Sequence, residues 1–297
     1  MSRTAPAAAT GRPDLDREAI AHYVLGRRTP EGGYSFYRTP AWGVEEPNAP
    51  DTLAAVESLR LLGVETPEPE ATARYLRSLA DNEGGYPSLT IGWAALRALD
   101  ALSTGPSRSP SAWLEGWVKK LFMYRPEGGD WAGAVHDAAR LSELVHLGGA
   151  QLSPTEQAAL GDLLEASRAP DGGWARPGPD LETTALAVRA GVLAGFPLHH
   201  DRLVAGFLHS CSDPVLGLRF APDAAATSAG GLWGGLALSA VLGEPLIYPE
   251  ATAQNLVLLQ RPDGGLGARH RAISTLTDTW RGLEAARLLE NHQEEPP

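Results

Sequence analysis

The stretch that decides the fold is residues 170–195, PDGGWARPGPDLETTALAVRAGVLAG. It contains an acidic-Gly-Gly turn, a loop, and a segment rich in Ala and Leu. The apolar residues of that segment recur every three or four positions, which indicates a helix. A Gly pair beside a helix is typical of a turn that needs positive φ. We therefore interpret the stretch as the turn and second helix of a helical hairpin.

The same turn recurs along the chain. Further copies are PEGG (30–33), NEGG (82–85), PEGG (126–129) and PDGG (262–265), and a weakened copy is DPVLG (213–217). Neighbouring turns lie 44 to 52 residues apart, at positions 32, 84, 128, 172, 216 and 264. Such a period indicates repeated supersecondary units. The chain of 297 residues is therefore expected to form one repeat domain and not two unrelated ones.

Two kinds of helix alternate around these turns. Segments after a turn, such as 51–63 and 232–243, are apolar on more than one face, as expected of helices enclosed by others. Segments before a turn, such as 70–80 and 155–166, carry more charge and are expected to form an outside wall. The alternation predicts an inner and an outer layer of helices.

The repeats predict an all-α fold, a six-hairpin α/α barrel of inner and outer helices. An open solenoid could be built from the same repeats, but inner helices rich in Ala and Gly favour a tightly packed closed ring. We expect a disordered leader at 1–13, a single barrel domain at 14–290 and a polar tail at 291–297.

Composition excludes several functions. A net charge of -11 argues against a nucleic-acid partner, since such proteins need a basic face. The sequence has no signal-peptide core and no run of about 18 apolar residues, so we expect no integral membrane segment and a cytoplasmic location. The one cysteine, Cys211, excludes an intramolecular disulfide and a thiolate cluster. A buried inert thiol is favoured over a metal site shared with His136.

The turn motif, GGW or GGY followed by an Asp or Thr that opens an Ala/Leu helix, resembles the repeat of two related families. These are the protein prenyltransferase β subunits and the squalene-hopene and related class II terpene cyclases. The resemblance covers about residues 19–290 and implies an isoprenoid small-molecule substrate. Class II cyclases carry a D-x-D-D-T-A segment in this place, and DLETTA at 180–185 aligns with it. The resemblance implies that Glu182 donates the proton, that Asp180 orients and tunes it, and that Thr183 replaces the third aspartate.

This match has one departure and one structural alternative. Glutamate in place of aspartate moves the acidic proton by about 1–1.5 Å in a reaction that depends on alignment. Paired carboxylates can still push their pKa values apart, leaving one protonated. Alternatively, Asp180 or Thr183 caps a helix, since Asp51 and Asp278 occupy the register of Thr183 in other repeats. The register of Glu182 holds a carboxylate only once.

Repeat six contains a second candidate site. Prenyltransferase β subunits have there an arginine for the diphosphate and then an Asp-x-Cys pair for zinc. Arg269 matches the arginine, but Thr275 and Thr277 stand at the zinc positions, and hydroxyls are poor zinc ligands. The resemblance thus leaves Arg269 and Arg271 as an anion cradle without zinc. Magnesium could assist a diphosphate, although no acidic triplet requires it, and a solvated basic loop is the alternative.

Register arithmetic adds an aromatic layer. When the inner helices are aligned on their terminal Leu-Gly, Trp93, Trp233 and Trp280 share one position, three residues after that of the candidate acid. Indole faces stabilise cations by about 0.5–2 kcal/mol each, so a lumen-facing register suits a carbocation. The alternative is that these rings fill a packed core. Trp42, in the long loop of the first repeat, is expected to cap the mouth.

These observations favour a class II-like terpene cyclase, which starts the cyclisation of an isoprenoid by protonation in an aromatic-lined lumen. The runner-up is a zinc-free prenyltransferase-like protein that binds an isoprenyl diphosphate. The third reading is a non-catalytic barrel that binds a partner. Related cyclases generally use a second α-barrel domain, so the resemblance implies a second α-barrel subunit, a homo-oligomer or a smaller substrate.

Overall fold

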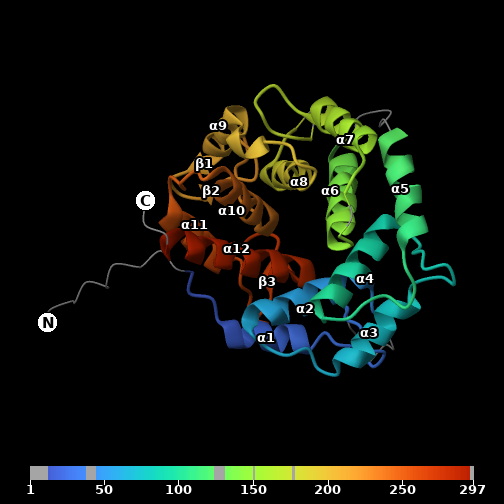
Figure 1. The fold of residues 1–297 in the computed structure, drawn as a ribbon. Coiled ribbons are helices and arrows are strands. Elements are labelled where there is room, and N and C mark those ends of the chain that lie inside the picture. The colour runs from blue at the N-terminus through green and yellow to red at the C-terminus, as the bar shows by residue number, and fades with distance from the viewer. Residues whose placement is uncertain (1–12, 38–44, 124–130, 150, 176–177, 295–297) are drawn as a thin grey trace, which may run out of the picture.

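The computed structural model describes residues 13–37, 45–123, 131–149, 151–175 and 178–294. Over these residues the chain is a ring of helical hairpins (Figure 1). The inner helices are α2 (Ala49–Leu62), α4 (Leu89–Ala101), α6 (Trp131–Leu147), α8 (Leu181–Leu193), α10 (Ala229–Leu242) and α12 (Leu276–Glu294). The outer helices are α1 (Arg17–Leu25), α3 (Pro69–Ser78), α5 (Ser111–Met123), α7 (Pro154–Ser167), α9 (Arg202–Ser210) and α11 (Pro249–Leu258). A short helix, η2 (Leu198–His200), precedes α9.

The ring is closed. Each inner helix packs against the inner helix of the next unit, and α12 packs against α2, so the last unit meets the first (Figure 1). Each outer helix packs against the inner helix of its own unit. The predicted six-hairpin α/α barrel is therefore confirmed, and the open solenoid is excluded.

The glycine turns join neighbouring units. A Cβ on Gly172, in the fourth unit, would collide with the backbone of Leu203 at the start of α9 in the fifth. A Cβ on Gly264, in the sixth unit, would collide with the backbone of Ala19 in α1 of the first. The same close approach thus links consecutive units and closes the ring. The first glycine of each described pair has the expected positive φ, at Gly32 (96°), Gly84 (83°), Gly172 (96°) and Gly264 (92°).

The inner helices begin with a common N-cap. In four of them a polar side chain accepts a hydrogen bond from the backbone N–H three residues later, which satisfies a donor that the helix leaves free. These caps are Asn48, Ser88, Asp180 and Ser228. In α12 the hydroxyl of Thr275 accepts a hydrogen bond from Asp278 N at 3.0 Å. The caps align the starts of the inner helices at one end of the barrel.

Some details differ from the predictions. Short antiparallel pairs, β1 (Ser212–Asp213) with β2 (Gly217–Leu218) and β3 (Leu266–Gly267) with β4 (Ser274–Thr275), close the turns of repeats five and six. α12 extends to Glu294, so part of the predicted polar tail continues the last inner helix. None of the helices in the described part of the chain combines the length and the apolar character that a membrane span requires.

Candidate active site

Glu182 is the second residue of α8, and it faces the two inner helices that follow. Its carboxylate lies against Gly230 of α10, where a Cβ would collide with it. Arg281 of α12 places its Nε 3.7 Å from Glu182 Oε1. The glycine of α10 thus leaves room for the acid, and α12 supplies the cation that faces it.

The surroundings of Glu182 change its acidity. Burial raises the pKa of this carboxyl, because the charged form loses its hydration. Arg281 opposes this and lowers the pKa, whereas the negative charges of Asp180 and Asp278 raise it, and the net direction is upward. Burial in turn lowers the pKa of Arg281, against the opposing effect of Glu284 and Glu182. Glu182 is therefore a weaker acid than an exposed glutamate, and it binds a proton more readily.

Asp180 caps α8. Its Oδ1 accepts a hydrogen bond from Thr183 N at 2.8 Å, and its Oδ2 accepts one from the Thr183 hydroxyl at 2.8 Å. This is the position held by a cap in other repeats, so Asp180 has the structural role of an N-cap, while Thr183 is the residue that donates to it. Thr183 Oγ1 also lies 3.4 Å from His136 Nε2. Asp180 acts on Glu182 through its charge, while its own oxygens hold the start of the helix.

The predicted aromatic layer exists, but its faces are occupied. Trp233 and Trp280 are buried, and the rings of Trp93 and Trp280 lie 6.4 Å apart between centroids. The guanidinium carbon of Arg281 lies 3.7 Å from the centroid of Trp233 and 4.8 Å from that of Trp280. Arg140 lies 5.6 Å from the centroid of Trp93, so the chain places its own cations beside all three indoles.

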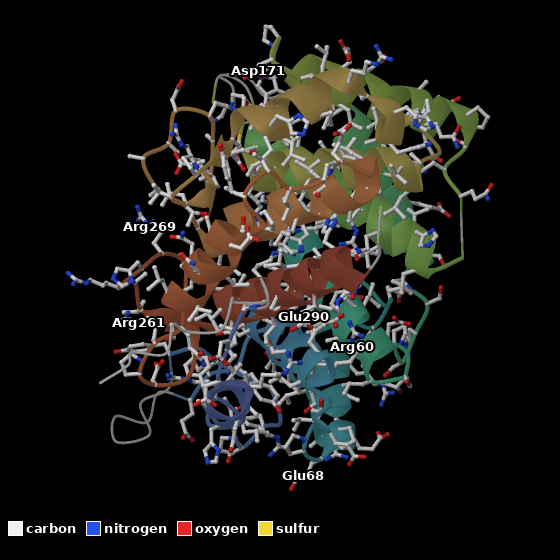
Figure 2. The ribbon with its side chains drawn as sticks, turned by 90° about the vertical axis from the view of Figure 1, so that its left-hand side faces the viewer. Arg60, Glu68, Asp171, Arg261, Arg269 and Glu290 are labelled. Atoms are coloured by element: carbon white, nitrogen blue, oxygen red, sulfur yellow. The ribbon has the colours of Figure 1, made fainter. Side chains whose placement is uncertain are left out.

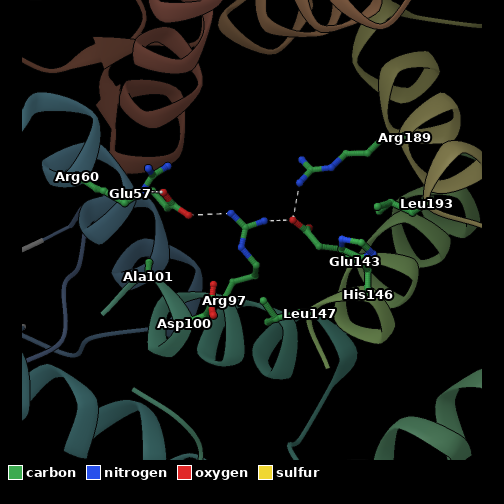
Figure 3. A pocket seen from close by; sticks show the side chains of 10 residues that line it. All are labelled: Glu57, Arg60, Arg97, Asp100, Ala101, Glu143, His146, Leu147, Arg189 and Leu193. Atoms are coloured by element: carbon green, nitrogen blue, oxygen red, sulfur yellow. Dashed lines mark hydrogen bonds and ion pairs between the residues drawn. The ribbon is translucent and has the colours of Figure 1, made fainter. Parts of the chain in front are cut away.

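A layer of ion pairs lies one turn further along the inner helices. Arg97 of α4 pairs with Glu143 of α6 and donates from Nη2 to Glu57 Oε1 at 2.7 Å. Arg189 Nη2 lies 2.6 Å from Glu143 Oε1, and Trp93 Nε1 donates to Glu143 Oε2 at 2.8 Å. Figure 3 shows these charged side chains converging from four inner helices. Glu143 therefore ties the indole layer to the ionic layer.

This ionic layer adds charged side chains to the predicted aromatic-lined lumen. A cavity of about 430 Å³ opens among its side chains near the C-terminal ends of the inner helices (Figure 3). Glu57 and Glu143 are further carboxylates of the interior, and both are held by arginines. Glu182 differs from them because its cation lies at 3.7 Å and hydrogen-bonds neither of its oxygens at close range.

Arg269 and Arg271 do not join Glu182. Both are exposed in the loop between β3 and β4, and the cavities that they line contain neither Glu182 nor the tryptophans of the aromatic layer. Figure 2 shows Arg269 toward one end of the barrel and Arg60, near the C-terminal end of α2, toward the other. The predicted anion cradle therefore lies at the outer rim, in cavities that Glu182 does not line.

The remaining candidates concern metals and the first loop. Cys211 is buried at the end of α9, and burial raises the pKa of its thiol to about 12, which matches the expected inert thiol. Among the described residues, no three His, Cys, Asp or Glu side chains gather as a metal site would require. Trp42 lies outside the described residues.

Sequence reasoning missed Arg281 and the ionic layer. The signal was present, because four residues after the aromatic register the same alignment holds Glu57, Arg97, Arg189 and Glu284. Positions i and i+4 share a helix face. If the tryptophan register faces the lumen, the charged residues four positions later are therefore expected to face it too. Arg281 is the one arginine in a register otherwise held by Ala, Gly and Leu.

Comparisons with known proteins define the class of fold. No protein-family model and no curated protein sequence matches the chain. Solved structures do match it, over nearly its whole length, and they include a protein prenyltransferase and a type II terpene cyclase. The fold is therefore the α/α barrel that these two classes of enzyme share.

Three of these structures show the extent of the likeness. Protein geranylgeranyltransferase-I of Candida albicans in complex with GGPP has a TM-score of 0.67 and 13% identity, over 94% of this chain and 92% of that one. A variant of the type II terpene cyclase MstE of Scytonema, in complex with geranylgeranyl dihydroxybenzoate, has a TM-score of 0.59 and 15% identity, over 93% of this chain and 97% of the cyclase chain. A protein from Actinoplanes has a TM-score of 0.55 and 19% identity, over 92% of this chain and 98% of the Actinoplanes chain.

Proposed function

We propose that the protein binds an isoprenoid in its barrel and starts the cyclisation of that molecule by proton transfer from Glu182. The observation that carries the proposal is the state of this carboxyl: burial raises its pKa, and its cationic neighbour stands 3.7 Å away and stacks on two indoles. The raised pKa shifts this partly buried carboxyl toward its protonated form, which is the form that proton donation requires.

Arg281 has a second partner, which allows it to leave the acid. Its Nη1 lies 3.4 Å from Glu284 Oε2, one turn further along α12. An apolar chain that reaches the indoles must displace the guanidinium toward Glu284. Glu182 then loses the positive charge that lowers its pKa, and it takes up a proton from solvent. Substrate entry thus loads the acid and frees the faces of Trp233 and Trp280.

The chemical step follows from these positions. Glu182 gives its proton to the terminal carbon of an alkene, the π bond breaks, and a tertiary cation forms on the neighbouring carbon. Trp233 and Trp280 face this cation in place of the guanidinium. Attack by a second alkene closes a ring, and loss of a proton from a carbon beside the final cation gives a neutral isomer of the substrate.

The comparisons support an isoprenoid as the substrate class. The Candida albicans enzyme is seen with GGPP, and the Scytonema cyclase with geranylgeranyl dihydroxybenzoate. Both ligands carry a geranylgeranyl chain, so that chain is the first substrate to test.

The test is incubation of the purified chain in D₂O with geranylgeranyl dihydroxybenzoate, GGPP or squalene, followed by mass spectrometry. We expect a cyclised product that has gained one deuterium at the former terminal alkene. Glu182→Gln should lower the rate at least 100-fold, because an amide cannot donate that proton. Glu115→Gln, an exposed change on α5, is the control. A Glu182→Gln protein that cyclises as fast as the parent would refute the proposal.

A rim cavity favours a second candidate function, binding of an isoprenyl diphosphate without zinc. The cavity measures about 350 Å³ and lies between Phe220, Ala224–Ala226 and the guanidinium of Arg269. Apolar walls beside one cation suit an apolar chain that ends in an anion. Arg269→Ala should then weaken GGPP binding in calorimetry, whereas Glu182→Gln should not.

Completion of the site by a second α-barrel subunit, or by a second copy of the chain, remains a proposal. Light scattering of the purified protein, with and without the geranylgeranyl substrate, tests it. A monomer that turns over at full rate would exclude both.

A further inference from the structure

Three cavities adjoin one another around the loop between β3 and β4. The first, of about 420 Å³, lies between this loop and α11, and the second, of about 530 Å³, lies on the side of the first repeat. They share Arg271 and Ala272, and the third cavity shares Arg269 with the first. They therefore form one continuous area, which we name the hairpin surface. Its principal members are Arg27, Tyr37, Leu258, Arg261, Arg269, Arg271 and Ile273.

Large apolar side chains project from the hairpin surface. Ile273 is 74% exposed, Tyr37 52% and Leu258 50%. Val215, 74% exposed, stands beside them, because its carbonyl accepts a hydrogen bond from Asn255, which lines the first cavity. Side chains of this size at this exposure, gathered in one area, mark an interaction site.

The charge of the hairpin surface is opposite to that of the whole chain. Among the described residues that line these cavities the one carboxylate is Asp263, and its Oδ2 lies 3.8 Å from Arg27 Nη2. Within the described part of the chain no ion pair holds Arg269 or Arg271. The chain as a whole carries a net charge of -11. A basic area on an acidic protein fits an anionic partner.

The hairpin surface lies at the end of the barrel where the inner helices begin. Ala229 N, the first residue of α10, donates a hydrogen bond to Ala268 O at 3.0 Å, which ties the loop to that end. Figure 2 shows Arg261 and Arg269 together toward this end, while Arg60 lies toward the other. Glu182 stands at the start of α8, so the acid and the hairpin surface belong to the same end.

We propose that the hairpin surface docks the barrel on a membrane that contains anionic lipid. Ile273, Leu258 and Tyr37 enter the boundary between headgroups and acyl chains, and Arg269 and Arg271 bind lipid phosphates above them. A lipid surface has phosphates outside and acyl chains beneath them, so it can bind the guanidiniums and the projecting apolar side chains at the same time. An acidic protein would satisfy only the guanidiniums. The proposal goes beyond the proposed reaction, and it places lipid, into which an isoprenoid partitions, at the end of the barrel where α8 and Glu182 begin.

The test is flotation of the purified chain with vesicles of phosphatidylcholine alone or with 30% phosphatidylglycerol. We expect binding to the anionic vesicles that falls at high salt. Arg269→Glu with Arg271→Glu should weaken binding at least about 30-fold, since each arginine contributes about 1 kcal/mol at such a surface. The control is Lys119→Glu with Arg202→Glu, the same charge change at exposed positions of α5 and α9. It should bind like the parent.

A second variant separates the apolar contribution. Ile273→Ser removes an exposed apolar side chain without changing the charge, so the variant should fold. It should lose the part of vesicle binding that remains at high salt. Equal binding to both vesicle types, or an equal loss in the control, would overturn the proposal. So would displacement from vesicles by pyrophosphate, which points to a phosphate pocket, or by polyglutamate, which points to an acidic protein, at an ionic strength where sodium chloride leaves the chain bound. Glu182→Gln should float like the parent, so a failure of the proposed reaction would leave this result standing.

Discussion

Replacing Arg281 with Met is expected to destabilise the barrel and to make its stability fall more steeply as the pH rises, because Glu182 loses the cation that faces it. The guanidinium stacks on Trp233 and Trp280 and faces Glu182 and Glu284 at 3.7 and 3.4 Å. Two indole contacts contribute about 0.5–2 kcal/mol each, and removing one partner of a buried pair costs about 3–5 kcal/mol. Methionine restores part of the packing and Glu182 can take up a proton, so we expect a net loss of about 3 kcal/mol at pH 7.5.

The pH dependence follows from the direction of the pKa shift. Burial, with Asp180 and Asp278, raises the pKa of Glu182, and loss of Arg281 raises it further. An acid whose folded pKa lies above its unfolded pKa costs no stability below the unfolded value, and its penalty grows as the pH rises toward the folded one. Arg281→Met should therefore lose less stability at pH 5 than at pH 7.5. Glu182→Gln in the same chain should remove that difference.

Urea unfolding followed by tryptophan fluorescence at both pH values measures these quantities for the parent, both single variants and the double variant. The coupling between the two positions should exceed about 1 kcal/mol at pH 7.5 and shrink at pH 5. An Arg281→Met variant that loses under about 0.5 kcal/mol would show that Arg281 and Glu182 do not interact as described. So would losses in the two single variants that add up to the loss in the double variant.

Further predictions test the closure, the cap and the thiol. Gly264→Ala forces a side chain onto the backbone of Ala19 at φ 92°, so we expect a loss of about 3 kcal/mol in urea unfolding. Gly105→Ala, which meets open space, should change little, and equal losses would contradict the contact. Asp180→Ala should cost about 1–2 kcal/mol through loss of the cap, whereas Asp180→Ser should keep most of it. An Ala variant as stable as the parent would exclude the cap. Cys211, with a pKa of about 12, should resist a thiol reagent at pH 8 until urea unfolds the chain, and rapid native labelling would contradict its burial.

The fold was predictable because each repeat contains single residues that its backbone conformation requires. The first glycine of each described Gly-Gly turn has a positive φ and closely approaches the next unit, so the turn sequence is restricted at these places. Closure itself needed the contact between Gly264 and Ala19, which no local pattern contains. The cap role of Asp180 was equally accessible, since Asn48, Ser88 and Ser228 stand in the same place.

The site was predictable only in part. Register arithmetic placed Trp93, Trp233 and Trp280 in one layer, but it assumed that the space between them is empty. Arg281 lies against Trp233 and Trp280 instead, and only packing in three dimensions shows which side chain takes that place. The rim position of Arg269 depends on the path of the β3–β4 loop, which spacing along the chain does not determine.

The contact of the sixth turn with α1 affects how the molecule unfolds. A linear array has two end units, each held by a single neighbour, and it can fray from there. Here every unit is held on two sides, so losing any one of them leaves two broken junctions and an open arc. Unfolding should accordingly proceed in one concerted transition, with no partially melted species populated on the way.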